Sequence, residues 1–269
     1  MLLRGVKSSL QRELDSFFQS VLSTDYSIRE VTKGALSQSR SKLNPEAFKE
    51  INDVACSSFY SDAPYLKWHG FRLLSIDGSR LHLPNHPSIK EEFGEYLVGR
   101  DASTPVSMGL VSMLYDPLNL LTLDSQITAW SDSEQSLFLK HIDKLQSGDL
   151  LLADRGYPSI YNFYLLRSKG VEFCFRMKED WWLPVRSLVE SGLKEMVVEL
   201  PLPKKDHKRE GGQSFSKEPP VRCRLILILL ENGEKEVLCT SLIDSALYPY
   251  ELFPELYHQR WGIEEGTSY

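Results

Sequence analysis

The sequence predicts an α/β protein, a mixed β-sheet flanked by helices, with an N-terminal helical region and a β-rich insertion. Three observations lead to this fold class. Residues 1–64 place apolar side chains at helical spacing, whereas from residue 65 apolar residues alternate or gather in short runs typical of strands. Helix-like and strand-like segments then follow one another up to residue 170. One run, 150–153, is wholly apolar, which indicates a strand covered by helices on both faces.

The composition is that of a globular protein, with 269 residues, 42% hydrophobic and 25% charged. The longest apolar run, LILILL at 225–230, is far shorter than the roughly 20 residues of a membrane span. The N-terminal MLLRGVKSSLQREL lacks the apolar core of a secretory signal. Four cysteines without a C-x-x-C pair are expected to be buried free thiols, Cys56, Cys174, Cys223 and Cys239. We therefore expect a protein of the reducing cytoplasm with no membrane partner.

Charge is spread unevenly along the chain. The net charge of −6 argues mildly against nucleic-acid binding when averaged over all residues. Residues 167–224, however, hold 13 Lys and Arg against 9 Asp and Glu, including the run KKDHKR at 204–209. This run is either a solvated loop or part of a basic surface. Carboxylates that hold metal ions lower the average charge without excluding a basic face elsewhere.

Residues 1–64 predict several helices. The first has helical spacing of its apolar residues, which are Leu10, Leu14, Phe17, Phe18 and Val21. Asn44, followed by Pro45 and Glu46, is typical of a helix start. Short helices with scattered basic residues form either a helix-turn-helix-like DNA-binding module or a plain helical cap, and both interpretations stay open here.

Residues 65–170 are expected to form the first part of the α/β core. FRLLSIDGSRLHLP (71–84) predicts a strand that ends at Asp77, a turn at Gly78 and Ser79, and a second strand. The later elements are expected as two strands around the turn YDPLN within 104–130, a helix at 131–145, a strand at 148–154 and a helix at 155–170. Residues 171–250 then predict a β-rich insertion of four strands, before a terminal helix within 251–269.

Two aspartates occupy one kind of position. Asp77 follows LLSI, Asp154 follows LLLA, and each precedes a glycine-containing turn. A carboxylate at a strand end is held rigidly at the edge where α/β sheets bind ligands. If the two strands are neighbours, the carboxylates converge and either share a proton or hold a hard cation. Glu264, on the terminal helix, is a candidate third ligand for a pair of metal ions that promote phosphodiester chemistry.

Three stretches resemble the catalytic segments of the DDE transposases of the IS-four insertion-sequence family. LLSIDGSRLHLP is similar to the strand with the family's first aspartate, and GDLLLADRGYPS to the segment with its second. YHQRWGIE matches the family's signature Tyr-x-x-Arg-x-x-x-Glu. The resemblance runs from about residue 25 to 269 and implies a ribonuclease H-like catalytic core. It assigns the catalytic and metal-binding roles to Asp77, Asp154 and Glu264, with the β-rich insertion between the last two.

The resemblance implies that two Mg²⁺ or Mn²⁺ ions at this triad promote cleavage at transposon ends and transfer of the freed 3′-hydroxyl to target DNA. The implied partner is double-stranded DNA, and the implied synaptic form is a homodimer. The implied location is a prokaryotic cytoplasm, at the nucleoid when DNA is bound. The expected DNA contacts are Tyr257, Arg260, Arg155 and Trp182. From the residues alone, an internal Arg260–Glu264 pair and simple packing of Tyr257 and Trp182 stay open.

The chain departs from the family signature at its end. The lysine that completes the signature would fall at position 271, two residues beyond Tyr269, and EGTSY continues a helix poorly. We therefore expect a C-terminally truncated transposase, shortened by a frameshift, an early stop or clipping, whose activity is open. Two other functions also stay open. One is a metal-dependent nuclease without transposition, and the other is a catalytically dead remnant that only binds DNA.

Overall fold

The computed structural model describes residues 9–24, 26, 29–99, 103–202, 218–230 and 232–261. The chain divides into two compact units, residues 1–55 and 56–269. Within the described ranges, no helix is long and apolar enough to cross a membrane. The N-terminal MLLRGVKS, the basic run KKDHKR and Glu264 lie outside the described residues, so the expectations placed on them stay predictions.

The first unit is helical, as predicted. Its elements are α1 Leu10–Leu22, α2 Lys33–Arg40 and the first part of α3 Glu46–Asp62. Gln11 joins the first two helices, because its Nε2 donates to the Val31 carbonyl at 2.9 Å and its Oε1 accepts from the Lys33 N–H at 2.9 Å. The Asn44 Oδ1 accepts from the Glu46 N–H at 3.1 Å, which confirms the predicted helix start. DNA binding by this unit stays a prediction.

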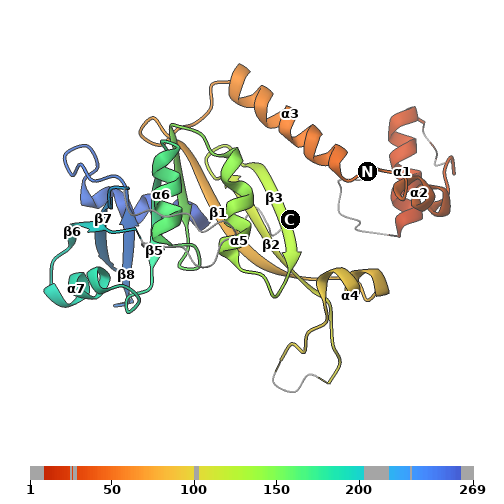
Figure 1. The fold of residues 1–269 in the computed structure, drawn as a ribbon. Helices are drawn as coiled ribbons and strands as arrows, with labels where there is room; N and C mark the ends of the chain where they lie inside the picture. Colours follow the sequence, from red (N-terminus) through yellow and green to blue (C-terminus); the bar gives the residue numbers. More distant parts are fainter. Residues whose placement is uncertain are drawn as a thin grey trace. The chain divides into compact units, whose positions relative to one another are not determined.

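The second unit is built on one mixed sheet, shown in Figure 1. Its strands are β1 Arg72–His82, β2 Met108–Asp116, β3 Leu121–Ala129, β4 Asp149–Ala153, β5 Glu172–Met177, β6 Glu195–Leu200, β7 Val221–Leu229 and β8 Lys235–Thr240. The strand order is β3-β2-β1-β4-β5-β8-β7-β6. The pairs β1–β4 and β4–β5 are parallel, and the other five pairs are antiparallel. The mixed α/β sheet predicted from the sequence is therefore confirmed.

The helices of the second unit are α4 Pro87–Phe93, α5 Glu134–His141, α6 Ile160–Ser168, α7 Leu183–Ser191 and α8 Phe253–His258. Short 3₁₀ turns are η1 Ile142–Lys144, η2 Tyr250–Leu252 and η3 Gln259–Trp261. Helices α5, α6 and α8 lie where the sequence predicted them. Helix α7 was not predicted inside the strand-rich block. It begins with Pro184 in its first turn and buries Val185 and Leu188, so packing stabilises a helix of only nine residues.

The predicted turn at Gly78 and Ser79 is wrong. Strand β1 runs without interruption from Arg72 to His82, because β2 pairs with it along its second half, including Gly78 with Ser112. A glycine inside a strand often marks a close approach by another group rather than a turn. At Gly78 an added Cβ would stand 3.1 Å from the Tyr157 hydroxyl and 3.2 Å from the Glu134 Oε1. The glycine therefore leaves room for side chains.

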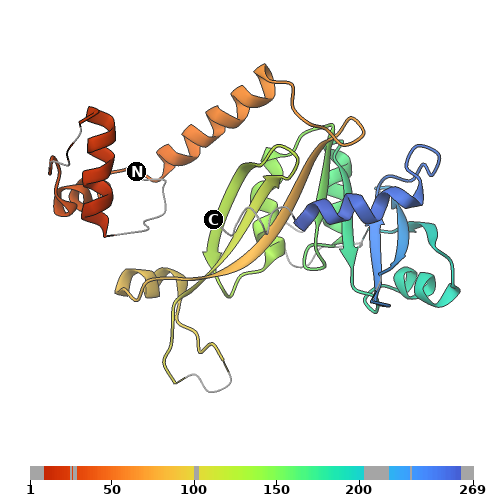
Figure 2. The same ribbon diagram turned by 180° about the vertical axis from the view of Figure 1, so that it is seen from behind.

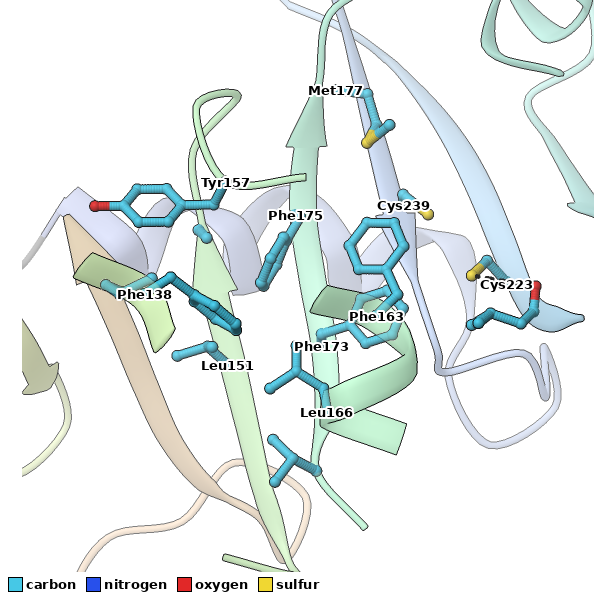
Figure 3. Close-up of a cluster of buried hydrophobic side chains, with 14 of the residues drawn as sticks. Phe138, Leu151, Tyr157, Phe163, Leu166, Phe173, Phe175, Met177, Cys223 and Cys239 are labelled. Carbon is cyan, nitrogen blue, oxygen red and sulfur yellow. Dashed lines mark hydrogen bonds between the residues drawn. The ribbon is translucent and has the colours of Figure 1, made fainter. Parts of the chain in front are cut away.

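Helices cover both faces of the sheet, as Figures 1 and 2 show. Helices α5 and α6 pack on one face, where Phe138, Phe163 and Leu166 meet Ile76 and Leu151. Figure 3 shows part of this cluster, including the two rings of Phe163 and Phe173, which stack with centroids 4.3 Å apart. The opposite face buries the apolar side of α8, namely Phe253, Leu256 and Tyr257, against Leu150 and Leu152. The four cysteines are buried free thiols, as predicted.

A buried polar network joins β2, β3 and α5. The His141 Nδ1 lies 2.8 Å from the Asp124 Oδ2, and its Nε2 lies 3.1 Å from the Ser112 Oγ. His141 and Ser112 have no exposed surface, and Asp124 has 8%. Burial acts to raise the pKa of Asp124, but hydrogen bonds from His141 and Gln126 hold it below the ordinary value. The ionised carboxylate is thus stabilised in the folded chain.

Replacing Asp124 by asparagine is expected to lower the free energy of unfolding by about 1–3 kcal/mol at neutral pH, since a buried network loses its charged member. A depressed carboxyl pKa contributes stability above the unfolded value, about 3.9, and loses it as pH falls through the folded value. The difference between the two chains should therefore shrink below about pH 4. Urea unfolding across pH 3–8 measures it, with the exposed Asp180→Asn as control. A difference independent of pH would contradict the assignment.

Candidate active site

The two aspartates singled out in the sequence lie next to each other. Strands β1 and β4 are parallel neighbours whose last registered pair is Ile76 with Ala153. Asp77 is the next residue within β1, which continues to His82, and Asp154 directly follows the end of β4. The two strands are therefore neighbours, which was the condition for the two carboxylates to converge. Their side chains are 29% and 32% exposed, so both carboxylates are held by buried strands yet reach solvent.

Helix α8 and the turn after it bring two further predicted residues to these carboxylates. The Tyr257 hydroxyl lies 3.4 Å from the Asp154 Oδ1, and the Arg260 Nη1 lies 3.6 Å from the Asp77 Oδ2. Both residues are only 3% exposed. Burial is the main cause that raises the pKa of Tyr257, so its hydroxyl stays protonated and donates a hydrogen bond to the Asp154 Oδ1. Glu264, three residues beyond Trp261, lies outside the described part of the chain.

Two groups missed by sequence reasoning extend the site along the sheet. Arg176 on β5 places its Nη1 4.0 Å from the Asp154 Oδ1 and its Nε 3.3 Å from the Glu236 Oε2 on β8. Burial raises the pKa of Glu236, an effect that Arg176 opposes and Asp154 reinforces. Asp154, Arg176 and Glu236 therefore form a row of charges of alternating sign across neighbouring strands. The sequence carried no signal for this row, because it joins residues brought together only by strand order.

The turn after β4 shapes the site beside the second aspartate. The Tyr157 N–H donates to the Asp154 carbonyl at 3.1 Å, which closes a four-residue turn. Asn162 secures it through a 3.0 Å hydrogen bond from its Nδ2 to the Tyr157 carbonyl. Tyr157 is buried and anchors the turn in the core, whereas Arg155 is exposed. The geometry thus leaves Arg155 accessible next to Asp154.

A third carboxyl group, Glu134, approaches the aspartates from the side of α5. Burial raises its pKa, and the charges of Asp77 and Asp154 raise it further. Its carboxylate lies against Gly156 and Gly78. The sequence predicted a helix at 131–145 but gave Glu134 no role in the site. Its proximity to the site depends on how α5 packs on the sheet, which no local pattern reveals.

Trp181 and Trp182, the two residues just before α7, differ in how far they are buried. Trp182 packs against the core, with its ring 5.9 Å from the Phe163 ring in an edge-on arrangement. Trp181 is 43% exposed, and the Lys178 Nζ lies 5.2 Å from its ring centroid. The residue expected to contact DNA, Trp182, is therefore the less accessible of the two.

The family model for the transposase DDE domain matches residues 68–268, which include both aspartates and the signature segment. The chain belongs to this family. The chain is also similar to the transposase InsG for insertion sequence element IS4 of Escherichia coli (strain K12), with 24% identity over 242 residues. The aligned part covers 88% of this chain, and the chain spans about half, 52%, of that curated relative. The resemblance to the IS-four family is thereby confirmed.

DDE transposases generally use divalent metal ions. Asp77 and Asp154 suit a hard cation, because their carboxylate oxygens are held next to each other by two interior strands of the sheet. Within the described ranges, no three His, Cys, Asp or Glu side chains are grouped to hold a metal ion. The predicted third ligand, Glu264, lies outside those ranges. The residues present therefore fit a divalent metal, with the complete ligand set still a prediction.

Proposed function

We propose that this chain is the catalytic part of a transposase that cleaves double-stranded DNA at the ends of an insertion sequence and joins the freed 3′-hydroxyl to target DNA. The observation that carries the proposal is the pairing of Asp77 and Asp154 on adjacent parallel strands, with Arg260 and Tyr257 against them. Membership of the DDE family supports the reaction class.

Asp77 and Asp154, with Glu264, would hold two Mg²⁺ or Mn²⁺ ions. Bound metal would activate the attacking water or 3′-hydroxyl and stabilise the leaving oxygen. Arg260 and Tyr257 act as the site's own hydrogen-bond donors. Asp77 would hold the cation, and the Arg260 guanidinium, 3.6 Å from the same carboxylate, would bind a DNA phosphate beside it. The Tyr257 hydroxyl holds Asp154 in place.

Exposed residues around this centre are proposed to contact DNA. Arg155 stands beside Asp154 and is free to reach a phosphate near the cleavage point. Trp182 is proposed to act mainly by holding the exposed Trp181, whose indole is better placed to stack on an unpaired base. Because two ends must be joined, the active form is proposed to be a homodimer, working at the nucleoid of a prokaryotic cytoplasm.

The test uses the full chain, a supercoiled plasmid and linear DNA that carries the terminal repeats expected on either side of its coding sequence. With Mg²⁺ or Mn²⁺ we expect cleavage at the repeat ends and joining of the freed ends to the plasmid, and with EDTA neither. Cleavage without joining would instead identify a nuclease. DNA binding without cleavage would identify a binding remnant.

A further inference from the structure

We propose that Glu134, on α5, is a further carboxylate of the active site and holds a water bound to the site's metal. The lack of a side chain at Gly156 leaves the space that the Glu134 carboxylate occupies. The inference rests on the proposed metal site at Asp77 and Asp154. It adds a residue that lies outside the Asp, Asp and Glu of the family signature.

The position of Glu134 is set by the start of α5. Ser133 caps the helix, since its Oγ accepts from the Ser136 N–H at 3.2 Å, and Glu134 is the first helical residue. Its side chain extends toward Gly78 within β1 and toward Gly156 in the turn after β4. A Cβ added to Gly156 would stand 1.7 Å from the Glu134 Oε2 and 2.9 Å from its Cδ. The carboxylate therefore occupies the space that any other residue at position 156 would fill.

Backbone conformation gives no competing reason for these glycines. Neither Gly156 nor Gly78 has a positive φ, so neither conformation is one that favours glycine. The Glu134 Oε1 lies 3.2 Å from where a Gly78 Cβ would be. Glycines of two separate segments, one within β1 and one after β4, thus flank the same carboxylate. At both positions a side chain would approach the Glu134 carboxylate, which gives one reason for both glycines.

The surroundings of Glu134 are unfavourable for a carboxylate without a cation. Burial and the two aspartates act against its charge, whereas Arg80 and Lys178 favour it. In the described part of the chain, no hydrogen bond or ion pair within 4.0 Å holds its carboxylate. A half-buried carboxylate brought against two others without a direct partner is destabilising unless a cation or water binds it.

A surface pocket of about 430 Å³ opens beside Glu134 and is lined also by Gly78, Arg80, Trp130 and Gly156. Water therefore reaches the carboxylate from this side. The described residues hold no ready-made group of three metal-binding side chains, so Glu134 is not placed as a direct ligand with the two aspartates. A water bound to the metal and held by Glu134 satisfies both observations.

The test is calorimetric titration of Mn²⁺ into the metal-free full chain and five variants. Glu134→Gln keeps the shape and removes the charge, so Mn²⁺ affinity should fall by about 10-fold or more. Gly156→Ala should cause a similar loss by displacing the carboxylate, and Gly156→Ala with Glu134→Gln should bind no more weakly than Glu134→Gln alone. The matched control is Asp132→Asn, an exposed carboxylate beside the same pocket, which should change affinity little.

Thermal unfolding without metal separates this role from a structural one. We expect Glu134→Gln to be at least as stable as the unaltered chain, because repulsion with Asp77 and Asp154 is removed. Unchanged Mn²⁺ affinity of Glu134→Gln, or its marked destabilisation without metal, would overturn the proposal. Asp154→Asn distinguishes the two levels of inference. If it too leaves Mn²⁺ binding unchanged, the metal site itself is wrong, whereas a loss in Asp154→Asn alone rejects only the role of Glu134.

Discussion

Replacing Asp154 or Asp77 by asparagine is expected to abolish metal-dependent DNA cleavage, with a rate at least about 10³-fold lower. The amide keeps the size of the side chain but removes the charge that a divalent ion requires. Each tenfold change in rate corresponds to about 1.36 kcal/mol, so a 10³-fold loss (about three such factors) means that several kcal/mol of metal-assisted stabilisation of the transition state are lost. The two carboxylates lie on neighbouring chain segments, one within β1 and one just after β4, so each replacement should be nearly as severe as the other.

Nicking of supercoiled plasmid in Mg²⁺ and in Mn²⁺ measures this effect. The matched control is Asp62→Asn at the end of α3, an exposed carboxylate for which full activity is expected. Both aspartates are partly exposed, so the variants should unfold at nearly the same urea concentration as the unaltered chain. Cleavage that persists in Asp154→Asn with the fold intact would show that the catalytic centre lies elsewhere.

Replacing Arg72 by methionine is expected to lower the free energy of unfolding by about 3–5 kcal/mol, because it leaves a buried carboxylate without its partner. The Arg72 Nε and Nη2 each lie 2.8 Å from an oxygen of Asp149, and its guanidinium lies 4.8 Å from the centroid of the Tyr60 ring. Asp149 is only 1% exposed. The pair joins the first residues of β1 and β4, the two strands that position the candidate catalytic residues Asp77 and Asp154.

The loss should depend on pH in a defined direction. Burial already raises the pKa of Asp149, although Arg72 opposes the shift, and removing Arg72 should raise it further. A carboxyl group with a raised pKa binds its proton more tightly in the folded chain, so stability falls as pH rises through that pKa. The Arg72→Met variant should therefore be closest to the unaltered chain in acid and furthest from it at neutral pH.

Urea unfolding between pH 4 and pH 8 measures the effect, and two further variants sharpen it. Arg72→Met with Asp149→Leu should recover much of the lost stability, since no buried charge remains unpaired. Lys90→Ala breaks the exposed pair with Glu95, whose side chains are 35% and 40% exposed, and should change stability by less than about 1 kcal/mol. An equally small change in Arg72→Met would show that the buried pair contributes little.

Much of the fold could be read from local patterns. The apolar run before Asp154 predicted a covered central strand, and β4 is buried along its whole length. The segments around YDPLN and the four strands after residue 171 were predicted because alternation and turn residues are short-range signals. Gly78 was misread as a turn because a glycine admits either a turn or a close approach. Only the packing of Glu134 and Tyr157 against it separates the two.

The sequence by itself determined the α/β class and the family, and it singled out Asp77 and Asp154 as candidate site residues, because these depend on periodicity and on short motifs that stay recognisable without a structure. Only the tertiary structure decided which groups meet at them. Strand order placed Arg176 and Glu236 beside Asp154, and the packing of α5 brought Glu134 against Gly156. These contacts join residues far apart in the chain, and their energies arise from burial and charge in the assembled sheet. No local stretch of sequence contains that information.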